Sequence, residues 1–212
     1  MDFLIRNEGI EDFREVEEIT RSAFWNIHVP GCNEHYLVHI MRNHRDLIPE
    51  LDFVMEKDGK IIGNIMYTKA KLVNDEGNIK EIITFGPVSI LPGFQKKGYG
   101  SKLIEYSISE AIKLGYQVIV IFGNPRNYIK HGFKSCKKYK VSLENGEYPT
   151  AMMVKELQAG VLDNNHWKYK ESEVYNFAIE EAEMFDRNFE KMEKKELLSQ
   201  EEFYILSHSR MI

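Results

Sequence analysis

Apolar positions recur with helical spacing in two segments near the start of the chain. The short apolar run at residues 3–6 predicts a strand, and residues 11–24 then carry apolar side chains every three or four positions. Pro30 and Gly31 break this pattern, and residues 34–44 resume it. We therefore predict one strand followed by two amphipathic helices.

From residue 51 onward, the apolar pattern changes to a period of two. Residues 51–57 and 60–70 flank Asp58-Gly59, a dipeptide typical of two-residue hairpin turns. After a second turn at residues 74–78, a further strand is expected at 80–91. Gly86-Pro87 interrupts it, and proline has no N–H to donate to a neighbouring strand. We expect strand pairing to fail or bulge at that point.

The next segment alternates helical and strand patterns. Residues 99–114 predict an amphipathic helix that ends at Gly115. The continuous apolar run at 117–122 is typical of a strand buried on both faces. The remaining elements expected in this part are a short helix and two strands, at 127–131, 133–139 and 151–157. The order of elements predicts a mixed α/β fold.

Residues 160–212 differ in charge from the rest of the chain. They contain 12 acidic and 7 basic side chains, whereas residues 1–159 contain equal numbers of each. Ser199 and Glu202 have the spacing of a capping box, which predicts a terminal helix. We divide the chain into a domain over 1–158 and a C-terminal acidic helical extension over 159–212. This extension is either a packing elaboration with a solvated acidic face, a lid, a pocket wall or a surface for homodimer formation.

Composition narrows the class of protein. The chain has 212 residues, a net charge of −5 and 43% hydrophobic residues, which is typical of a folded globular protein. Without a basic surface it is not expected to bind nucleic acid. The two cysteines, Cys32 and Cys136, are too few for a disulfide framework and favour a reducing compartment. No segment has the roughly 20 apolar residues of a membrane span, and no secretion signal is recognised. We therefore expect a cytoplasmic protein with no membrane partner.

Candidate chemistry is concentrated in residues 88–103. A strand there leads through glycines into a helix, so that several backbone N–H groups and the positive end of the helix dipole face one point. Gly98 and Gly100 allow close backbone approach, and Lys96, Lys97 and Lys102 add positive charge. The segment predicts a site for a phosphate or diphosphate.

Two common phosphate-binding motifs do not fit this segment. It lacks the Gly-Lys-Ser/Thr triplet of a P-loop, and Leu103 occupies the position where a dinucleotide fingerprint has Gly or Ala. A generic nucleotide-binding domain remains an alternative, which would require tight binding of ATP or NAD.

The spacing Gln95-x-x-Gly98-x-Gly100 resembles the acyl-coenzyme A pyrophosphate loop of the GNAT N-acetyltransferase superfamily. Downstream, Tyr128-x-x-x-Gly132-Phe133 is similar to a second signature of that family, and the order of elements agrees over residues 3–157. The resemblance implies a GNAT-like splayed sheet with acetyl-CoA as cosubstrate. It also implies acetyl transfer to a primary amine of a small molecule or peptide, by direct attack and without an acyl-enzyme.

The resemblance also implies roles for individual residues. The gap beside the strand at 81–90 would accept the pantetheine arm, which would hydrogen-bond the strand backbone. Tyr128 would be the general acid that protonates the leaving thiolate, the alternative being a core tyrosine. Asn124 either bonds the cofactor or caps the short helix. The expected cofactor-binding residues are Val88, Ser89, Ile90, Gln95, Lys96, Lys97, Gly98, Tyr99, Gly100, Ser101 and Asn124.

The general base is not evident from the motifs. Some family members carry a glutamate on the central strand, but the equivalent position here is Thr84, and Glu81 should face the opposite side. We expect deprotonation through ordered water or by a side chain from the entry helices. The missing carboxylate leaves open an alternative function, a non-catalytic acyl-CoA sensor.

The loop between the first two helices borders the amine site in the resembled fold. Trp25, His28, Glu34 and Tyr36 are therefore the candidates for binding the acceptor, with structural histidines as the alternative. Cys32, His35 and His39 have a spacing from which a metal site can be drawn, but such short spacings are common by accident and we expect no metal.

Overall fold

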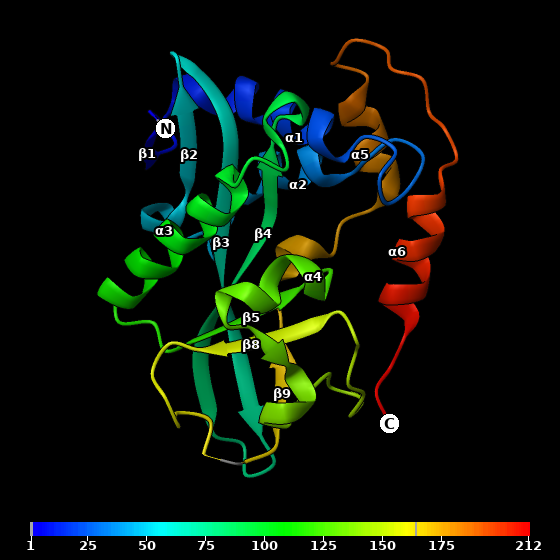
Figure 1. Cartoon of the computed structure of the whole chain (residues 1–212). Coiled ribbons are helices and arrows are strands. Elements are labelled where there is room, and N and C mark those ends of the chain that lie inside the picture. The colour runs from blue at the N-terminus through cyan, green and yellow to red at the C-terminus, as the bar shows by residue number, and fades with distance from the viewer. Residues whose placement is uncertain (1, 164) are drawn as a thin grey trace.

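A mixed sheet forms the centre of the molecule, with helices on both of its faces (Figure 1). The computed structural model describes residues 2–163 and 165–212. The strands are β1 (Leu4–Asn7), β2 (Phe53–Lys57), β3 (Lys60–Asn74), β4 (Ile79–Ile90), β5 (Val118–Phe122), β6 (Lys134–Ser135), β7 (Val141–Ser142), β8 (Met152–Glu156) and β9 (Trp167–Lys170). The α-helices are α1 (Phe13–Phe24), α2 (Glu34–Met41), α3 (Tyr99–Lys113), α4 (Pro125–Tyr128), α5 (Ile179–Asp186) and α6 (Leu198–His208).

The sheet is continuous but splits in the middle. Its strand order is β1-β2-β3-β4-β5-β8-β6, with β9 joined to β3 and β7. β1 to β4 are antiparallel, and β5 pairs with β8 along its whole length. Between these halves, β4 and β5 are parallel and share a single aligned pair, Ile83 with Ile119. The predicted splayed α/β sheet is therefore confirmed.

Local sequence signals place the hairpin and the irregularity in β4 correctly. Asp58 and Gly59 have φ of 51° and 73°, and Lys57 pairs with Lys60 across them. These positive angles are those of a type I′ turn, which Asp-Gly favours. The register between β3 and β4 shifts between Ile65 and Tyr67, opposite the interruption at Gly86-Pro87. The predicted bulge is confirmed.

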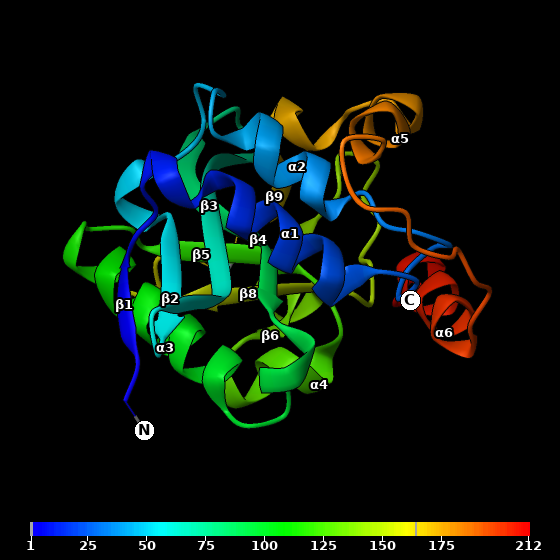
Figure 2. The same cartoon turned by 90° about the horizontal axis from the view of Figure 1, so that it is seen from above.

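The helices cover the two faces of β3 because alternate side chains point in opposite directions. Met66 packs in a cluster with Val16 and Ile19 of α1, while Tyr67 packs in a cluster with Leu103 of α3. Figure 2 shows α1 and α2 on one side of the sheet and α3 on the other. No helix among the described residues is long and apolar enough to cross a membrane.

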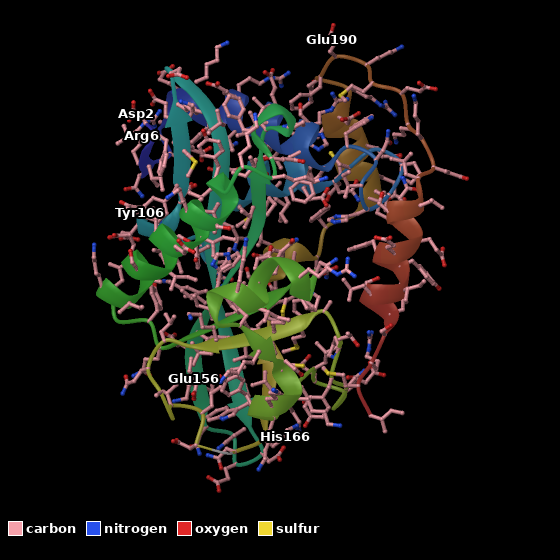
Figure 3. The ribbon with its side chains drawn as sticks, in the orientation of Figure 1. Asp2, Arg6, Tyr106, Glu156, His166 and Glu190 are labelled. Carbon is pink, nitrogen blue, oxygen red and sulfur yellow. The ribbon has the colours of Figure 1, made fainter. Side chains whose placement is uncertain are left out.

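The C-terminal segment contains the predicted helices and also an unpredicted strand. β9 pairs with β3, and its Trp167 and Tyr169 are buried in one cluster with Val118 and Val120. The four residues of β9 are too few to show a period against the surrounding acidic helical pattern. Figure 3 labels Glu156, which accepts the Gly160 N–H where the chain leaves β8, and His166, which precedes β9.

Two smaller predictions are wrong. The expected strand at 133–139 ends at Ser135, because Cys136–Tyr139 form a 3₁₀ turn in which Cys136 is fully buried. α6 begins at Leu198, so Ser199 lies inside the helix and its buried hydroxyl has no hydrogen-bond partner among the described residues. The expected capping box is therefore not formed there.

Candidate active site

The glycine loop leads directly into the N-terminus of α3. Gly98 has a φ of +87°, a left-handed conformation that glycine adopts without steric cost, and α3 begins at the next residue. Because Gly98 has no side chain to cap the helix, the N–H groups of the first turn are available to an anion. Lys96 also has positive φ, at 58°, which turns the loop toward the helix.

Beyond Ile83, β4 has no strand paired to its β5-facing edge among the described residues. The N–H of Leu91 donates to Ile62 O at 2.8 Å, so Leu91 is bonded toward β3. Peptide groups alternate sides along a strand, and those of Ile90 and Val88 therefore point away from β3, into the gap. The side-chain amide of Gln95 already donates to Ile90 O at 2.9 Å. The N–H of Ile90 and the backbone groups of Val88 have no strand partner on this side among the described residues.

A cleft of about 530 Å³ joins the glycine loop, the free edge of β4 and α4. Nine residues predicted for the site line it: His28, Val88, Ile90, Gln95, Lys96, Gly98, Gly100, Ser101 and Tyr128. Lys130 also lines it and donates from Nζ to Ser101 Oγ at 2.6 Å. The cleft therefore has two lysines at the end where the helix dipole is positive.

Four other residues predicted for cofactor binding do not line the cleft. Ser89 is fully buried and donates to Thr20 Oγ1 at 3.0 Å. Lys97 donates to Gly93 O at 2.8 Å. Tyr99 is buried among core aromatic residues, and Asn124 accepts the N–H of Arg126 as the cap of α4.

Tyr128 presents an aromatic wall beside the gap in the sheet. Its ring packs against Phe85 and Phe133, with centroid separations of 5.9 and 6.0 Å. Burial raises the pKa of Tyr128 to about 12, because water no longer stabilises the phenolate. The hydroxyl is therefore protonated at neutral pH. Gly123 makes this position possible, since a Cβ there would lie 2.6 Å from Tyr128 Cε2.

The acceptor candidates fall into two groups. His28 lines the cleft, and its Nδ1 lies 2.7 Å from Glu34 Oε1. Trp25 instead lines a small cavity of about 150 Å³ between the loop after α1 and the C-terminal segment, and donates to Glu193 O. Tyr36 packs against Phe177 and Phe185, outside the cleft.

No carboxylate faces the cleft from β4. Thr84 is buried and its hydroxyl is hydrogen-bonded to Tyr169, which leaves it no role as a base. Glu81 is exposed and pairs across the sheet with Lys71.

Cys32, His35 and His39, whose spacing allows a metal site to be drawn, do not point to one common position. Cys32 Sγ lies 3.3 Å from His35 Nδ1, and both are buried, with Asp186 3.1 Å from His35 Nε2. His39 points elsewhere, to Glu17 at 2.9 Å. Among the described residues, no group of three or more His, Cys, Asp or Glu side chains is arranged to hold a metal ion. Burial raises the pKa of the Cys32 thiol, so this cysteine is not an activated nucleophile.

Several residues of the cleft carry no signal in the sequence. Ala23, Phe24 and Ile27 lie at the end of α1 and in the following turn, where the helical pattern treats them as ordinary core or surface positions. Phe203 of α6 stacks on His28 with a centroid separation of 4.2 Å. It lies 175 positions from His28 in the numbering, so only the tertiary fold brings it there.

Comparisons with known proteins agree with this geometry. The acetyltransferase (GNAT) domain family model matches residues 50–135. An uncharacterized N-acetyltransferase of Escherichia coli strain K12, YjhQ, is 28% identical over 89 residues, which are 42% of this chain and 48% of that protein. The match thus spans about half the length of this curated relative.

Two solved structures share the fold over most of their length. The GNAT family acetyltransferase from Brucella melitensis in complex with acetyl-CoA has a TM-score of 0.65 and 22% identity, covering 82% of this chain and 98% of that one. YhbS from Escherichia coli, in complex with CoA, has a TM-score of 0.71 and 20% identity, covering 82% and 92%. The chain has the GNAT fold, and its residues 50–135 match the model of the acetyltransferase (GNAT) domain family.

Proposed function

We propose that this chain transfers an acetyl group from acetyl-CoA to a primary amine by direct attack, with Tyr128 as the general acid. The observation that carries the proposal is the single cleft in which the N-terminus of α3, the free edge of β4 and Tyr128 meet. The Brucella and YhbS structures, which share this fold, contain acetyl-CoA and CoA respectively.

The residues at one end of the cleft suit a diphosphate. The first-turn N–H groups of α3 face the same space as Lys96 and Lys130. A side chain at Gly98 would be strained at its φ of +87°, and a Cβ on Gly100 would lie 3.5 Å from Ile90 Cγ1. The absence of a side chain at both positions keeps the backbone accessible to the anion.

The other parts of the cleft suit the thioester arm. Backbone groups of Val88 are free to pair with the pantetheine amides in the manner of an added strand. Tyr128 stays protonated, so its hydroxyl donates to the sulfur and gives up a proton as the C–S bond breaks. A free thiol has a pKa of about 8.5, so the departing CoA thiolate takes up a proton at neutral pH. This protonation makes the CoA thiol a good leaving group.

The acceptor class follows from the charge of the molecule and the wall of the cleft. Primary amines are cations at neutral pH, and the acidic C-terminal segment raises their local concentration. The aromatic wall of Phe24 and His28 accommodates the carbon chain of such an acceptor, of a small molecule or a peptide. Transfer occurs without an acyl-enzyme, since the two cysteines are buried.

Calorimetric titration with acetyl-CoA, followed by measurement of CoA release with a panel of primary amines, tests the proposal. We expect binding of acetyl-CoA and amine-dependent CoA release. Gly100→Glu should abolish binding, because it fills the cradle and repels the phosphates. Binding with no CoA release from any amine would favour an acyl-CoA sensor, and absence of binding would overturn both readings.

A further inference from the structure

Of the residues in the loop between α1 and α2 (25–33), His28 lines the cleft and is also hydrogen-bonded to a carboxylate. Its Nδ1 lies 2.7 Å from Glu34 Oε1. The second oxygen of Glu34 accepts the N–H of Asn33 at 3.1 Å, so the carboxylate is held from both sides. The arrangement links the loop after α1 to the first turn of α2.

The carboxylate determines which ring nitrogen of His28 carries the proton. An ionised carboxylate only accepts hydrogen bonds, so the neutral imidazole places its hydrogen on Nδ1. The lone pair is then on Nε2, which makes no hydrogen bond with any residue in 2–163 or 165–212. Nε2 is therefore the atom of this pair that is able to accept a proton.

Two aromatic rings fix the plane of the imidazole. Phe203 of α6 stacks on it at 4.2 Å with an interplanar angle of 22°, and Phe24 packs at 5.5 Å. His28 is thus positioned by α1, α2 and α6 together. Such restraint is expected of a group that must meet a substrate in one orientation.

The other titratable groups of the cleft are less suited to accept a proton. Lys96 and Lys130 carry positive charge at the phosphate end, and Tyr128 is protonated. His131 lines the cleft beside Lys130, with Lys155 also nearby and Glu105 3.4 Å from its Nδ1. Burial and the two lysines lower the pKa of His131, which weakens it as a base.

We infer that His28, oriented by Glu34 and held under Phe203, is the general base that deprotonates the acceptor amine. This inference rests on the proposed acetyl transfer. His28 Nε2 takes one proton from the acceptor ammonium, and the neutral nitrogen forms the C–N bond to the acetyl carbon as the C–S bond breaks. Tyr128 supplies a proton to the thiolate and regains one, through solvent, from the nitrogen of the product. The protonated His28 then releases its proton to water, so that one proton is released per transfer.

The need for a base depends on the pKa of the acceptor amine. Comparing amines of different pKa therefore tests the inference. At pH 7 a lysine-type amine with a pKa near 10.4 is neutral in roughly one molecule in 2,500, whereas an α-amine near 8 is neutral in about one in ten. His28→Gln keeps the polarity of the site but removes the base. We expect it to lower kcat/KM for lysine-type amines by roughly 10²- to 10⁴-fold and for α-amines by about tenfold less. Its kcat/KM should rise about tenfold per pH unit toward the pKa of the amine.

His39→Gln is the matched control. His39 also pairs with a carboxylate, Glu17 at 2.9 Å, and contacts an aromatic ring, Phe185 at 4.4 Å, but it does not line the cleft. It should retain the wild-type pH profile, while Glu34→Gln should show a partial loss. Calorimetric affinity for acetyl-CoA should be unchanged in all three variants.

The outcomes separate the inference from the proposed function. Wild-type protein that releases CoA with an amine, together with His28→Gln of unchanged pH profile, overturns the inference alone. An equal loss for both amine classes also overturns it, because that result reports only a structural role. Wild-type protein that binds acetyl-CoA but releases no CoA with any amine overturns the proposed function, and the base assignment with it.

Discussion

Tyr128 combines a protonated hydroxyl with a site beside the gap in the sheet. Because burial raises its pKa to about 12, it remains an acid at pH values where an exposed tyrosine, near 10, begins to ionise. Tyr128→Phe should reduce kcat by roughly 10- to 10⁴-fold and leave acetyl-CoA affinity unchanged. The wild-type kcat should show no alkaline loss assignable to this residue below about pH 10. Unchanged turnover in the variant would remove Tyr128 from the mechanism.

We expect Gly123 to affect activity only by leaving space for the Tyr128 ring. A Cβ at this position would lie 2.6 Å from Tyr128 Cε2, so Gly123→Ala must displace the aromatic ring. We expect a loss of kcat approaching that of Tyr128→Phe, with little change in acetyl-CoA binding. Gly9→Ala is the control, since Gly9 has extended backbone angles and a Cβ there meets only Asp12 at 3.4 Å. Equal activity of the two alanine variants would show that the ring moves without consequence.

At the scale of elements, signals carried by adjacent residues predicted structure well. Asp58-Gly59 determined a hairpin, and Gly86-Pro87 a bulge, because each dipeptide restricts its own backbone. The strand β9 and the stacking of Phe203 on His28 were beyond such signals. Both depend on contacts between distant parts of the chain, β9 with β3 and α6 with the loop after α1. The glycine loop that leads into α3 was therefore predictable from sequence, whereas the contact of Phe203 with His28 was not.

Asp52, immediately before β2, contacts the N-terminal segment through a buried carboxyl group beside Glu8. Burial, the charge of Glu8 and a hydrogen bond with it raise the pKa of Asp52 to about 8. The folded state thus retains a proton that the unfolded chain loses near pH 3.9. The stability from this proton is complete below about pH 4 and is lost as pH rises to about 8.

Asp52→Asn should therefore stabilise the protein at pH 8, by about 1–3 kcal/mol, because the amide stays neutral. The gain should shrink toward pH 5. Thermal unfolding at the two pH values measures it, with an expected shift of about 2–4 °C per kcal/mol for a chain of this size. Asp58→Asn, in an exposed turn, should change little at either pH. A larger penalty for Asp52→Asn at pH 8 than at pH 5 would contradict the proposed protonation.

At the scale of the whole molecule, the C-terminal segment consists of two parts with different attachments. The first part contributes β9 to the sheet, with Trp167 and Tyr169 each 4% exposed. The second part, α6, has no buried residue and contacts the rest of the molecule through the stack of Phe203 on His28 and near its ends, where Gln200 donates to Asn26 O and Thr150 donates to Ser209 O. Figure 1 shows α6 standing at the side of the molecule, away from the sheet.

Truncation after each part should have different effects. A chain ending at residue 158 loses both buried aromatic side chains of β9, each worth about 3–5 kcal/mol, and should fail to fold cooperatively. A chain ending at residue 196 keeps β9, α5 and the Asn26 contact with Lys195, and should fold and bind acetyl-CoA. Because it lacks Phe203, its kcat/KM for amines should fall while cofactor affinity stays the same. Circular dichroism melts, calorimetry and CoA release distinguish these outcomes. A cooperatively folded 1–158 chain would show instead that the predicted domain boundary at residue 158 is a physical one and that β9 is dispensable to the core.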